Sequence, residues 1–371
     1  MDSSIKSQVE KSSSIVSKQS EQWLVFRSDL LSLRLDKRVP SILLALFVVT
    51  LAAMVWSVGQ GEYPVPPLDV IRTVVGLPTD NADYVFIVNT LRLPRTLVAW
   101  GVGVGLAITG TLTQAISRNP LAAPDIIGFD AGASLAAVSL IVVFPSVPIS
   151  LLPFAAMGGA LSIAILIYLV AWRGGSSPIR LILVGIGFNF VALALTDLMV
   201  TFGNINDVSQ ALVWLAGSVY GRSWEQAIAF APWLAIFGLL SLLMSRELNA
   251  LQMGDDVARS LGSRIEWQRG WLLLSAVALS GAAVATAGTV GFVGLMSPHI
   301  ARQLVGPSHE GLLPVAALTG GLVVVVADLI GRLLFAPIEL PCGIVTAVIG
   351  APYFLYLLIR DGTAFPRENR P

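Results

Sequence analysis

Long apolar runs separated by short polar stretches fill the chain from residue 40 onward. A helix that crosses a bilayer needs about 20 apolar residues, and most of these runs reach that length. Pro145, Pro148 and Pro153 divide the charge-free stretch 131–172 into two segments. The pattern predicts ten membrane-embedded helices, of which the third and eighth are short. Their expected ranges are 40–60, 94–116, 131–144, 150–172, 180–202, 227–246, 268–288, 291–305, 312–334 and 341–360.

Composition places the chain in the membrane. Of its 371 residues, 55% are hydrophobic and only 12% are charged, whereas a soluble globular protein carries about 25% charged residues. So few charges cannot cover a surface that faces water. The net charge of zero gives no reason to expect a nucleic-acid partner. We therefore expect an all-α polytopic membrane protein.

The distribution of Lys and Arg predicts the orientation, because these residues accumulate in cytoplasmic loops. If the N-terminus is cytoplasmic and the helices alternate, all but five of the 23 Lys and Arg residues lie inside. The five outside are Arg72, Arg92, Arg95, Arg222 and Arg332. An even number of spans with both termini in the cytoplasm is predicted.

Three regions follow from this pattern. Residues 1–38 form a polar cytoplasmic tail, residues 39–361 the transmembrane domain, and residues 362–371 a cytoplasmic C-terminal tail. The N-terminal tail is rich in Ser, Lys, Gln and Glu, as disordered segments are. An amphipathic helix at the membrane surface around residues 23–35 is the alternative.

One polar segment interrupts the second half of the chain. Residues 247–269 read ELNALQMGDDVARSLGSRIEWQR and lie between the charge-free stretches 226–245 and 270–298. A conspicuous cytoplasmic segment of this kind is typical of a membrane protein that contacts a soluble partner. It indicates a transport subunit driven from outside its own chain.

The pattern inside this segment predicts two short helices. Gly254 should break the helix. Leu248, Leu251, Val257 and Leu261 recur at helical spacing, so we expect them to share one apolar face.

Several kinds of chemistry have no residues to support them. The sequence contains no G-x-x-x-x-G-K-[ST] phosphate-binding loop, so ATP would have to bind another subunit. Neither a Ser/His/Asp set nor an H-E-x-x-H motif is present, and no catalytic residue is predicted. One cysteine and two histidines are too few for a thiolate or histidine metal site, so we expect no metal and no cofactor in this chain.

Ionisable residues at membrane depth are costly and are therefore candidates for function. Asp197 lies in the fifth predicted helix and has no local partner. Asp328 and Arg332 lie four residues apart in the ninth, where they can pair on one helix face. Gly101 and Gly105 form a G-x-x-x-G pattern that allows close helix packing.

Four stretches together carry a resemblance to a known family. They read RLPR at residues 92–95, RNPLAAPDIIGFDAGA at 118–133, GTVGFVGLMSPHIARQLVG at 288–306 and ELPCGIVTAVIGAP at 339–352. In this order and spacing they resemble the FecCD-like permeases of ABC importers, which serve ferric siderophores, haem and cobalamin. The resemblance runs from about residue 40 to residue 361 and leaves the N-terminal tail outside.

The resemblance implies the type II ABC importer permease architecture. The protein would lie in a bacterial inner membrane, with both termini in the cytoplasm. Two permeases would form the core, either a heterodimer of paralogues, which we favour, or a homodimer. Two cytoplasmic ATPase subunits would bind ATP and Mg, and a periplasmic binding protein would deliver the cargo. Transport would proceed by alternating access.

The resemblance also assigns roles to residues that match the family's motifs. For coupling to the ATPase within residues 247–264, the matching positions are Glu247, Leu251, Gly254, Asp255, Ala258, Leu261 and Gly262. For docking of the binding protein they are Arg92, Arg95 and Arg332. For the cytoplasmic gate they are Asn119, Leu121, Ser176 and Ser177.

The expected cargo is a ferric siderophore, with cobalamin or haem as the alternative. Asp197 is unusual for the family's fifth helix and is a candidate pathway residue, where it would disfavour a strongly anionic cargo. A secondary transporter driven by an ion gradient is the rival class, but it would need paired intramembrane carboxylates and would not need the 247–269 segment.

Overall fold

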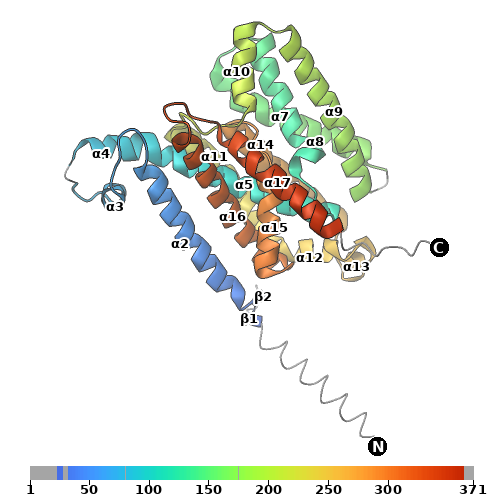
Figure 1. The fold of residues 1–371 in the computed structure, drawn as a ribbon. Helices are drawn as coiled ribbons and strands as arrows, with labels where there is room; N and C mark the ends of the chain where they lie inside the picture. The colour runs from blue at the N-terminus through green and yellow to red at the C-terminus, as the bar shows by residue number, and fades with distance from the viewer. Residues whose placement is uncertain (1–22, 28–31, 80, 174, 363–371) are drawn as a thin grey trace, which may run out of the picture.

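The computed structural model describes residues 23–27, 32–79, 81–173 and 175–362. This part of the chain is a helical bundle preceded by a short hairpin (Figure 1). The first half contains α2 (Arg38–Gly59), α3 (Pro67–Val75), α4 (Asp83–Phe86), η1 (Ile87–Arg92), α5 (Leu93–Ser117), α6 (Pro124–Ile127), α7 (Phe129–Val138), η2 (Ser139–Val143), η3 (Ile149–Leu151) and α8 (Leu152–Ala171). The second half contains α9 (Pro178–Phe202), α10 (Ile205–Leu215), α11 (Trp224–Leu243), α12 (Ser245–Gln252), α13 (Asp255–Ser260), α14 (Ile265–Ala287), α15 (Val293–Val305), α16 (His309–Leu333) and α17 (Cys342–Gly362).

The ten predicted segments all correspond to helices. Within the described residues, eight helices are long and apolar enough to cross a membrane. The two others are the segments predicted to be short: α7 continues into η2 over Phe129–Val143, and α15 has 13 residues. The all-α polytopic fold expected from the hydrophobic pattern is therefore confirmed.

The centre of the bundle is formed by α5, α14 and α16. In their most apolar windows, 89%, 72% and 56% of the residues are buried, against at most 28% in the other long helices. In Figure 1, α2, α3 and α4 lie on one side of these central helices, and α8, α9 and α10 lie on the other. The outer helices are apolar on their exposed faces too, as a membrane environment requires.

Small residues let the central helices touch backbone to backbone. A Cβ placed on Gly103 of α5 would collide with the carbonyl oxygen of Gly320 in α16, and one on Gly110 would collide with that of Gly294 in α15. Glycine has no Cβ, so these helices can approach more closely than any other residue would allow. The bundle therefore depends on these contacts for the position of α5.

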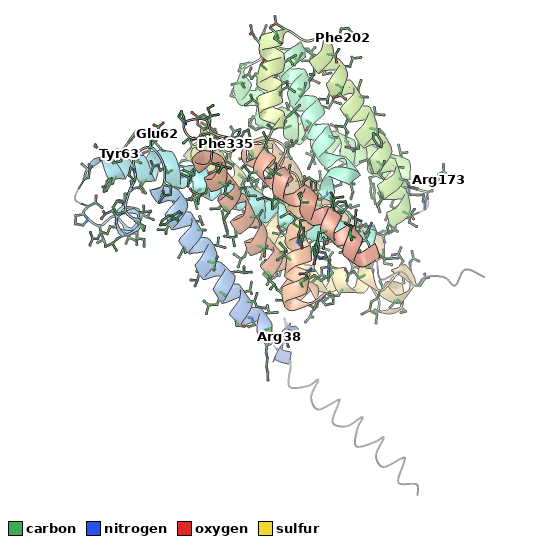
Figure 2. All side chains as sticks on the ribbon, viewed as in Figure 1. Arg38, Glu62, Tyr63, Arg173, Phe202 and Phe335 are labelled. Carbon is green, nitrogen blue, oxygen red and sulfur yellow. The ribbon has the colours of Figure 1, made fainter. Side chains whose placement is uncertain are left out.

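Side chains on the outer helices point away from the bundle in all directions (Figure 2). Phe202 at the end of α9 is 83% exposed, and Arg38 begins α2 at the opposite end of the molecule. Such exposed apolar side chains are suited to contact with lipid or with another protein.

Two strands lie where an amphipathic helix was the alternative expectation for residues 23–35. β1 (Trp23–Arg27) pairs antiparallel with β2 (Ser32–Asp36), in the register Trp23↔Asp36. The amphipathic helix expected around residues 23–35 is therefore wrong. The alternation of polar and apolar residues in SLRLD favours a strand, because side chains in a strand point to opposite faces in turn.

Candidate functional site

The segment predicted to contact an ATPase folds as two short helices. α12 ends at Gln252 and α13 begins at Asp255, with Gly254 between them. Gly254 has φ 112° and ψ 152°, a conformation almost exclusive to glycine, so the expected break is present. Gly262, with φ 84°, follows the end of α13. Glycines thus fix both ends of α13.

The predicted single apolar face of this segment is wrong. Leu248 and Leu251 in α12 are 0% and 2% exposed and pack against the bundle, whereas Val257 and Leu261 are 44% and 67% exposed. The bend at Gly254 turns α13 relative to α12, so helical spacing across the break does not keep the four residues on one side.

The exposed part of the segment forms what we call the coupling surface: Met253, Val257 and Leu261. Gly262 is exposed beside it. Ala258 is fully buried and holds α13 against the bundle. The segment is therefore anchored through one set of apolar residues and leaves another set exposed.

Asn249 anchors α12 to the start of α16. Its amide Nδ2 donates to Glu310 Oε2 at 2.7 Å, and its Oδ1 accepts from the His309 backbone N–H at 3.0 Å. The same Oδ1 lies 2.7 Å from His309 Nδ1, a contact that requires the proton on Nδ1. Glu247, also in α12, is half-buried. These contacts fix the first half of the coupling segment.

Asp255, the first residue of α13, pairs with two arginines from other elements. Its Oδ1 lies 2.8 Å from Nη2 of Arg269 in α14 and also accepts a hydrogen bond from Nη2 of Arg118. Arg118 follows the end of α5, and its Nε donates to the Leu251 carbonyl oxygen at 2.9 Å. The coupling segment is therefore joined to α5 and α14 at the same carboxylate.

The predicted gate residue Ser176 lies in the turn between α8 and α9 and is bound to α14. Its backbone N–H and hydroxyl donate to Glu266 Oε2 at 3.0 Å and 2.5 Å. Arg269 Nη1 donates to the Ser176 carbonyl oxygen and lies 2.9 Å from its hydroxyl oxygen. Ser177 is the next residue and precedes the first turn of α9.

The other predicted gate residues, Asn119 and Leu121, lie in the loop after α5. Asn119 Oδ1 accepts from the Leu121 backbone N–H at 2.9 Å, which closes a tight turn next to Arg118. Both predicted gate loops are thus connected to the coupling segment through Asp255, by way of Arg118 and Arg269. Their role in gating stays a prediction.

The three arginines predicted to dock a binding protein have partners within the chain. Arg92 donates to the carbonyl oxygens of Val58, Gly59 and Tyr63 at 3.0, 3.3 and 2.8 Å. It therefore fastens the end of α2 and the loop after it to the start of α5.

Arg95 and Arg332 share the buried carboxylate of Asp328. Arg95 Nη2 lies 2.7 Å and Arg332 Nε 3.4 Å from its oxygens, and Arg95 Nη1 lies 2.9 Å from Glu339. Arg332 is only 9% exposed and also donates to the Ser57 hydroxyl at 2.6 Å. The expected Asp328–Arg332 pair is present, but its third member, Arg95, was not predicted. The docking role of Arg92, Arg95 and Arg332 stays a prediction.

Asp197 lies on the exposed side of α9, in the part of the helix near Phe202. Its backbone carbonyl accepts from the Thr201 hydroxyl at 2.7 Å. Its carboxylate faces away from the bundle, so only a neighbouring molecule could enclose it in a pathway. The pathway role stays a prediction.

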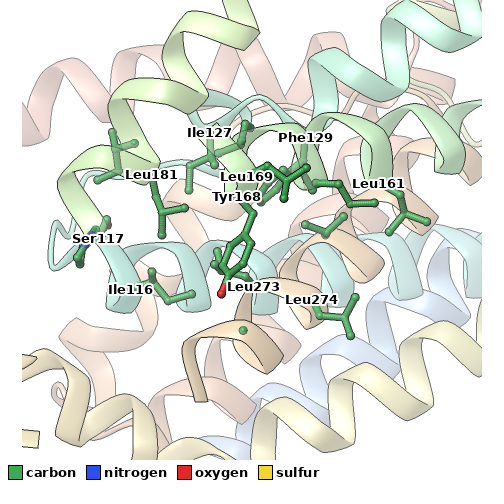
Figure 3. Close-up of a pocket in the computed structure, with 17 residues that line it drawn as sticks. Ile116, Ser117, Ile127, Phe129, Leu161, Tyr168, Leu169, Leu181, Leu273 and Leu274 are labelled. Atoms are coloured by element: carbon green, nitrogen blue, oxygen red, sulfur yellow. The ribbon is translucent and has the colours of Figure 1, made fainter. Parts of the chain in front are cut away.

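A cavity of about 340 Å³ lies beside the first turn of α9 (Figure 3). Its walls come from α5, α6, α7, α8, α9 and α14 and are almost entirely apolar, with Tyr168 and Ser117 as the polar exceptions. Ile116, Leu181 and Leu273 are among the lining residues labelled in Figure 3. The first turn of α9 therefore borders free volume as well as the polar contacts of Ser176.

Across the described residues, no three His, Cys, Asp or Glu side chains gather as a metal ion would require. Cys342 is a buried free thiol. His299 lies 2.9 Å from Gln303 through its Nε2, and His309 is bound to Asn249. The structure brings charged groups together in two places, around Asp255 of the coupling segment and around Asp328 of α16.

The described residues form a helical bundle with eight helices that could cross a membrane, and comparison with known proteins gives the family. The FecCD transport family matches residues 46–360, and the chain belongs to this family.

Two relatives and one solved structure illustrate the similarity. The achromobactin transport system permease protein CbrC of Dickeya dadantii (strain 3937) is 44% identical over 319 residues, covering 86% of this chain and 90% of CbrC. The Fe(3+)-citrate import system permease protein YfmE of Bacillus subtilis (strain 168) is 41% identical over 326 residues, covering 88% and 96%. A structure described as a metal-chelate type ABC transporter in an inward-facing conformation has a TM-score of 0.78 and 30% identity, covering 86% of this chain and 99% of that one. The expected architecture of an ABC importer permease is confirmed.

Proposed function

We propose that this chain is one permease subunit of an ATP-driven importer that carries a ferric siderophore across a bacterial inner membrane. The observation that carries this proposal is the similarity over most of the chain to permeases named for iron chelates. Cobalamin and haem remain the other cargoes that the same machinery could carry.

The proposed partners are a second permease, two cytoplasmic ATPase subunits and a periplasmic binding protein. The sequence has no phosphate-binding loop of its own, which requires ATP to bind elsewhere. The coupling surface of Met253, Val257 and Leu261 is exposed and apolar, as a surface that fits a groove on another protein should be. A heterodimer of paralogous permeases is the proposed core.

The proposed mechanism is alternating access driven through residues 247–264. ATP binding and hydrolysis on the partner would move the coupling surface, and the anchored residues of α12 and α13 would carry that motion into the bundle. No residue of this chain takes part in covalent chemistry. Asn119, Leu121, Ser176 and Ser177 would then open or close the cytoplasmic end of the path.

Uptake in cells with and without the gene tests the cargo. Radiolabelled iron is supplied as several siderophore chelates and as ferric citrate, with labelled cobalamin and haem in parallel. We expect loss of one iron chelate with cobalamin and haem uptake unchanged. Loss of cobalamin or haem uptake alone would contradict the proposed cargo, and uptake that survives ATP depletion while a proton gradient is kept would contradict the ABC mechanism.

Replacing Gly254 with Val should uncouple ATP hydrolysis from uptake. The φ of 112° at this position costs a β-branched residue about 1–3 kcal/mol, so α13 must turn and carry the coupling surface with it. We expect uptake to fall several-fold while the assembled complex still hydrolyses ATP. Ser260→Val, which places the same valine side chain at the exposed end of α13 without a positive φ, is the control. Equal uptake by both variants would contradict the role of the break.

A further inference from the structure

We propose that Asp255 is the positioning residue that connects the coupling segment to both cytoplasmic gate loops, so that its loss separates ATP hydrolysis from transport. This proposal rests on the proposed function. It adds a particular route for the motion, through Arg269 to the Ser176 turn and through Arg118 to the loop that contains Asn119.

The route through Arg269 is buried. Arg269 heads the largest fully buried side chains of the described residues, at 1% exposure. Its Nη2 pairs with Asp255 at 2.8 Å, and its Nη1 donates to the carbonyl oxygen of Ser176. One guanidinium therefore bridges the first residue of α13 and the turn before α9. Its planar shape fixes the direction of both contacts, which a flexible point charge would not do.

The Ser176 turn can respond to a displacement of Arg269 in few ways. Its backbone N–H and hydroxyl are held by Glu266, one turn before Arg269 on α14, and its carbonyl oxygen is held by Arg269 itself. Ser176 is 5% exposed, so water cannot readily replace these contacts. A displacement of Arg269 must either move the turn or break a buried hydrogen bond.

The route through Arg118 reaches the other loop. Arg118 has φ 54°, a left-handed conformation that is uncommon for a residue with a side chain. Its Nε donates to Leu251 in α12 and its Nη2 to Asp255 in α13, on the two sides of the Gly254 break. Because Asn119 follows directly, the turn that begins the second gate loop is fixed to both short helices.

The neighbouring residue provides a matched comparison. Asp256 is also in the first turn of α13, but its side chain is fully exposed and its 3.4 Å contact is with Arg259 on the same helix. Removing either carboxylate deletes the same charge from the same segment. Of the two carboxylates, only Asp255 pairs with the arginines next to α5 and on α14. The two variants therefore separate a general effect of lost charge from the effect of the lost connection.

The test uses the complete importer in proteoliposomes and measures iron chelate imported per ATP hydrolysed. Asp255→Asn should lower this ratio at least tenfold while ATP hydrolysis continues, and Asp256→Asn should leave the ratio unchanged. Equal ratios for the two variants would overturn the proposal. If the wild-type complex itself imports no iron chelate, the proposed function fails, which is a result distinct from the failure of the Asp255 connection alone.

Two further variants separate transmission from simple neutralisation of a buried charge. If Asp255 only compensates Arg269, then Asp255→Asn combined with Arg269→Met removes the unpaired charge and should restore the ratio, which would overturn the proposal. We expect the double variant to fold and remain uncoupled. If Asp255→Asn alone does not fold, Arg118→Met leaves the buried pair intact and cuts only the branch to α5. We expect a several-fold lower ratio for Arg118→Met, and a wild-type ratio there would count against the connection.

Discussion

Asp328→Asn is expected to destabilise the folded protein by about 3–5 kcal/mol, because breaking a buried ion pair leaves uncompensated charge in the interior. The Asp328 side chain is 3% exposed and lies between Arg95 of α5 and Arg332 of α16. Arg332 in turn holds the end of α2 through Ser57. Loss of the carboxylate therefore leaves two cations without their shared partner where three helices meet.

The midpoint of thermal unfolding in detergent micelles measures this effect. Asp69→Asn is the matched control, because its partner Arg72 lies three residues away on the same helix and is 42% exposed. Such a pair contributes at most about 1 kcal/mol. We expect the unfolding midpoint to fall strongly for Asp328→Asn and to change little for Asp69→Asn. Similar midpoints for both variants would show that the buried network does not hold α2, α5 and α16 together.

Gly110→Ala should have a comparable effect through packing alone. The added Cβ would lie closer to the backbone of Gly294 in α15 than any non-bonded contact allows. The helices α5 and α15 must therefore move apart. Overpacking of this kind costs about 1–3 kcal/mol and more where backbone has to shift. The yield of folded protein and its unfolding midpoint should both fall.

Gly158→Ala is the control for this packing effect. Gly158 also lies inside a long helix, α8, but a Cβ there meets nothing within 4 Å. Replacing an exposed helical glycine with alanine is neutral or slightly stabilising, by up to about 1 kcal/mol. A destabilisation of the same size in both variants would mean that the contact with Gly294 does not explain the Gly110 result.

The hydrophobic pattern predicted the helices well because membrane insertion depends on local composition. The two short segments and the break at Gly254 were also recognisable, since length and glycine act locally. The G-x-x-x-G pattern at Gly101 and Gly105 indicated close packing, but these positions face the Phe230 ring. Close backbone contacts of α5 occur instead at Gly103 and Gly110, and which neighbour a glycine meets depends on the tertiary fold.

The contacts of the candidate site were less predictable. Arg95 and Asp328 are 233 residues apart in the chain, and Arg118 and Asp255 are 137 apart, so no local pattern connects them. The apolar residues of α12 and α13 were assigned to one face because helical spacing was carried across Gly254. A conformation of φ 112° changes the direction of the chain there, and the amino-acid sequence does not specify by how much.

The central position of α5 has a mechanical consequence. This helix of 25 residues is about 37 Å long, and its ends carry Arg95 and, just after it, Arg118. At Gly103 and Gly110 its backbone touches α16 and α15 directly. It should therefore behave as a stiff lever: a tilt of about 5° around its middle would move the two ends by roughly 1.5 Å in opposite directions. A displacement at the Arg118 end would then reach the Arg95 end without any change in the helix itself.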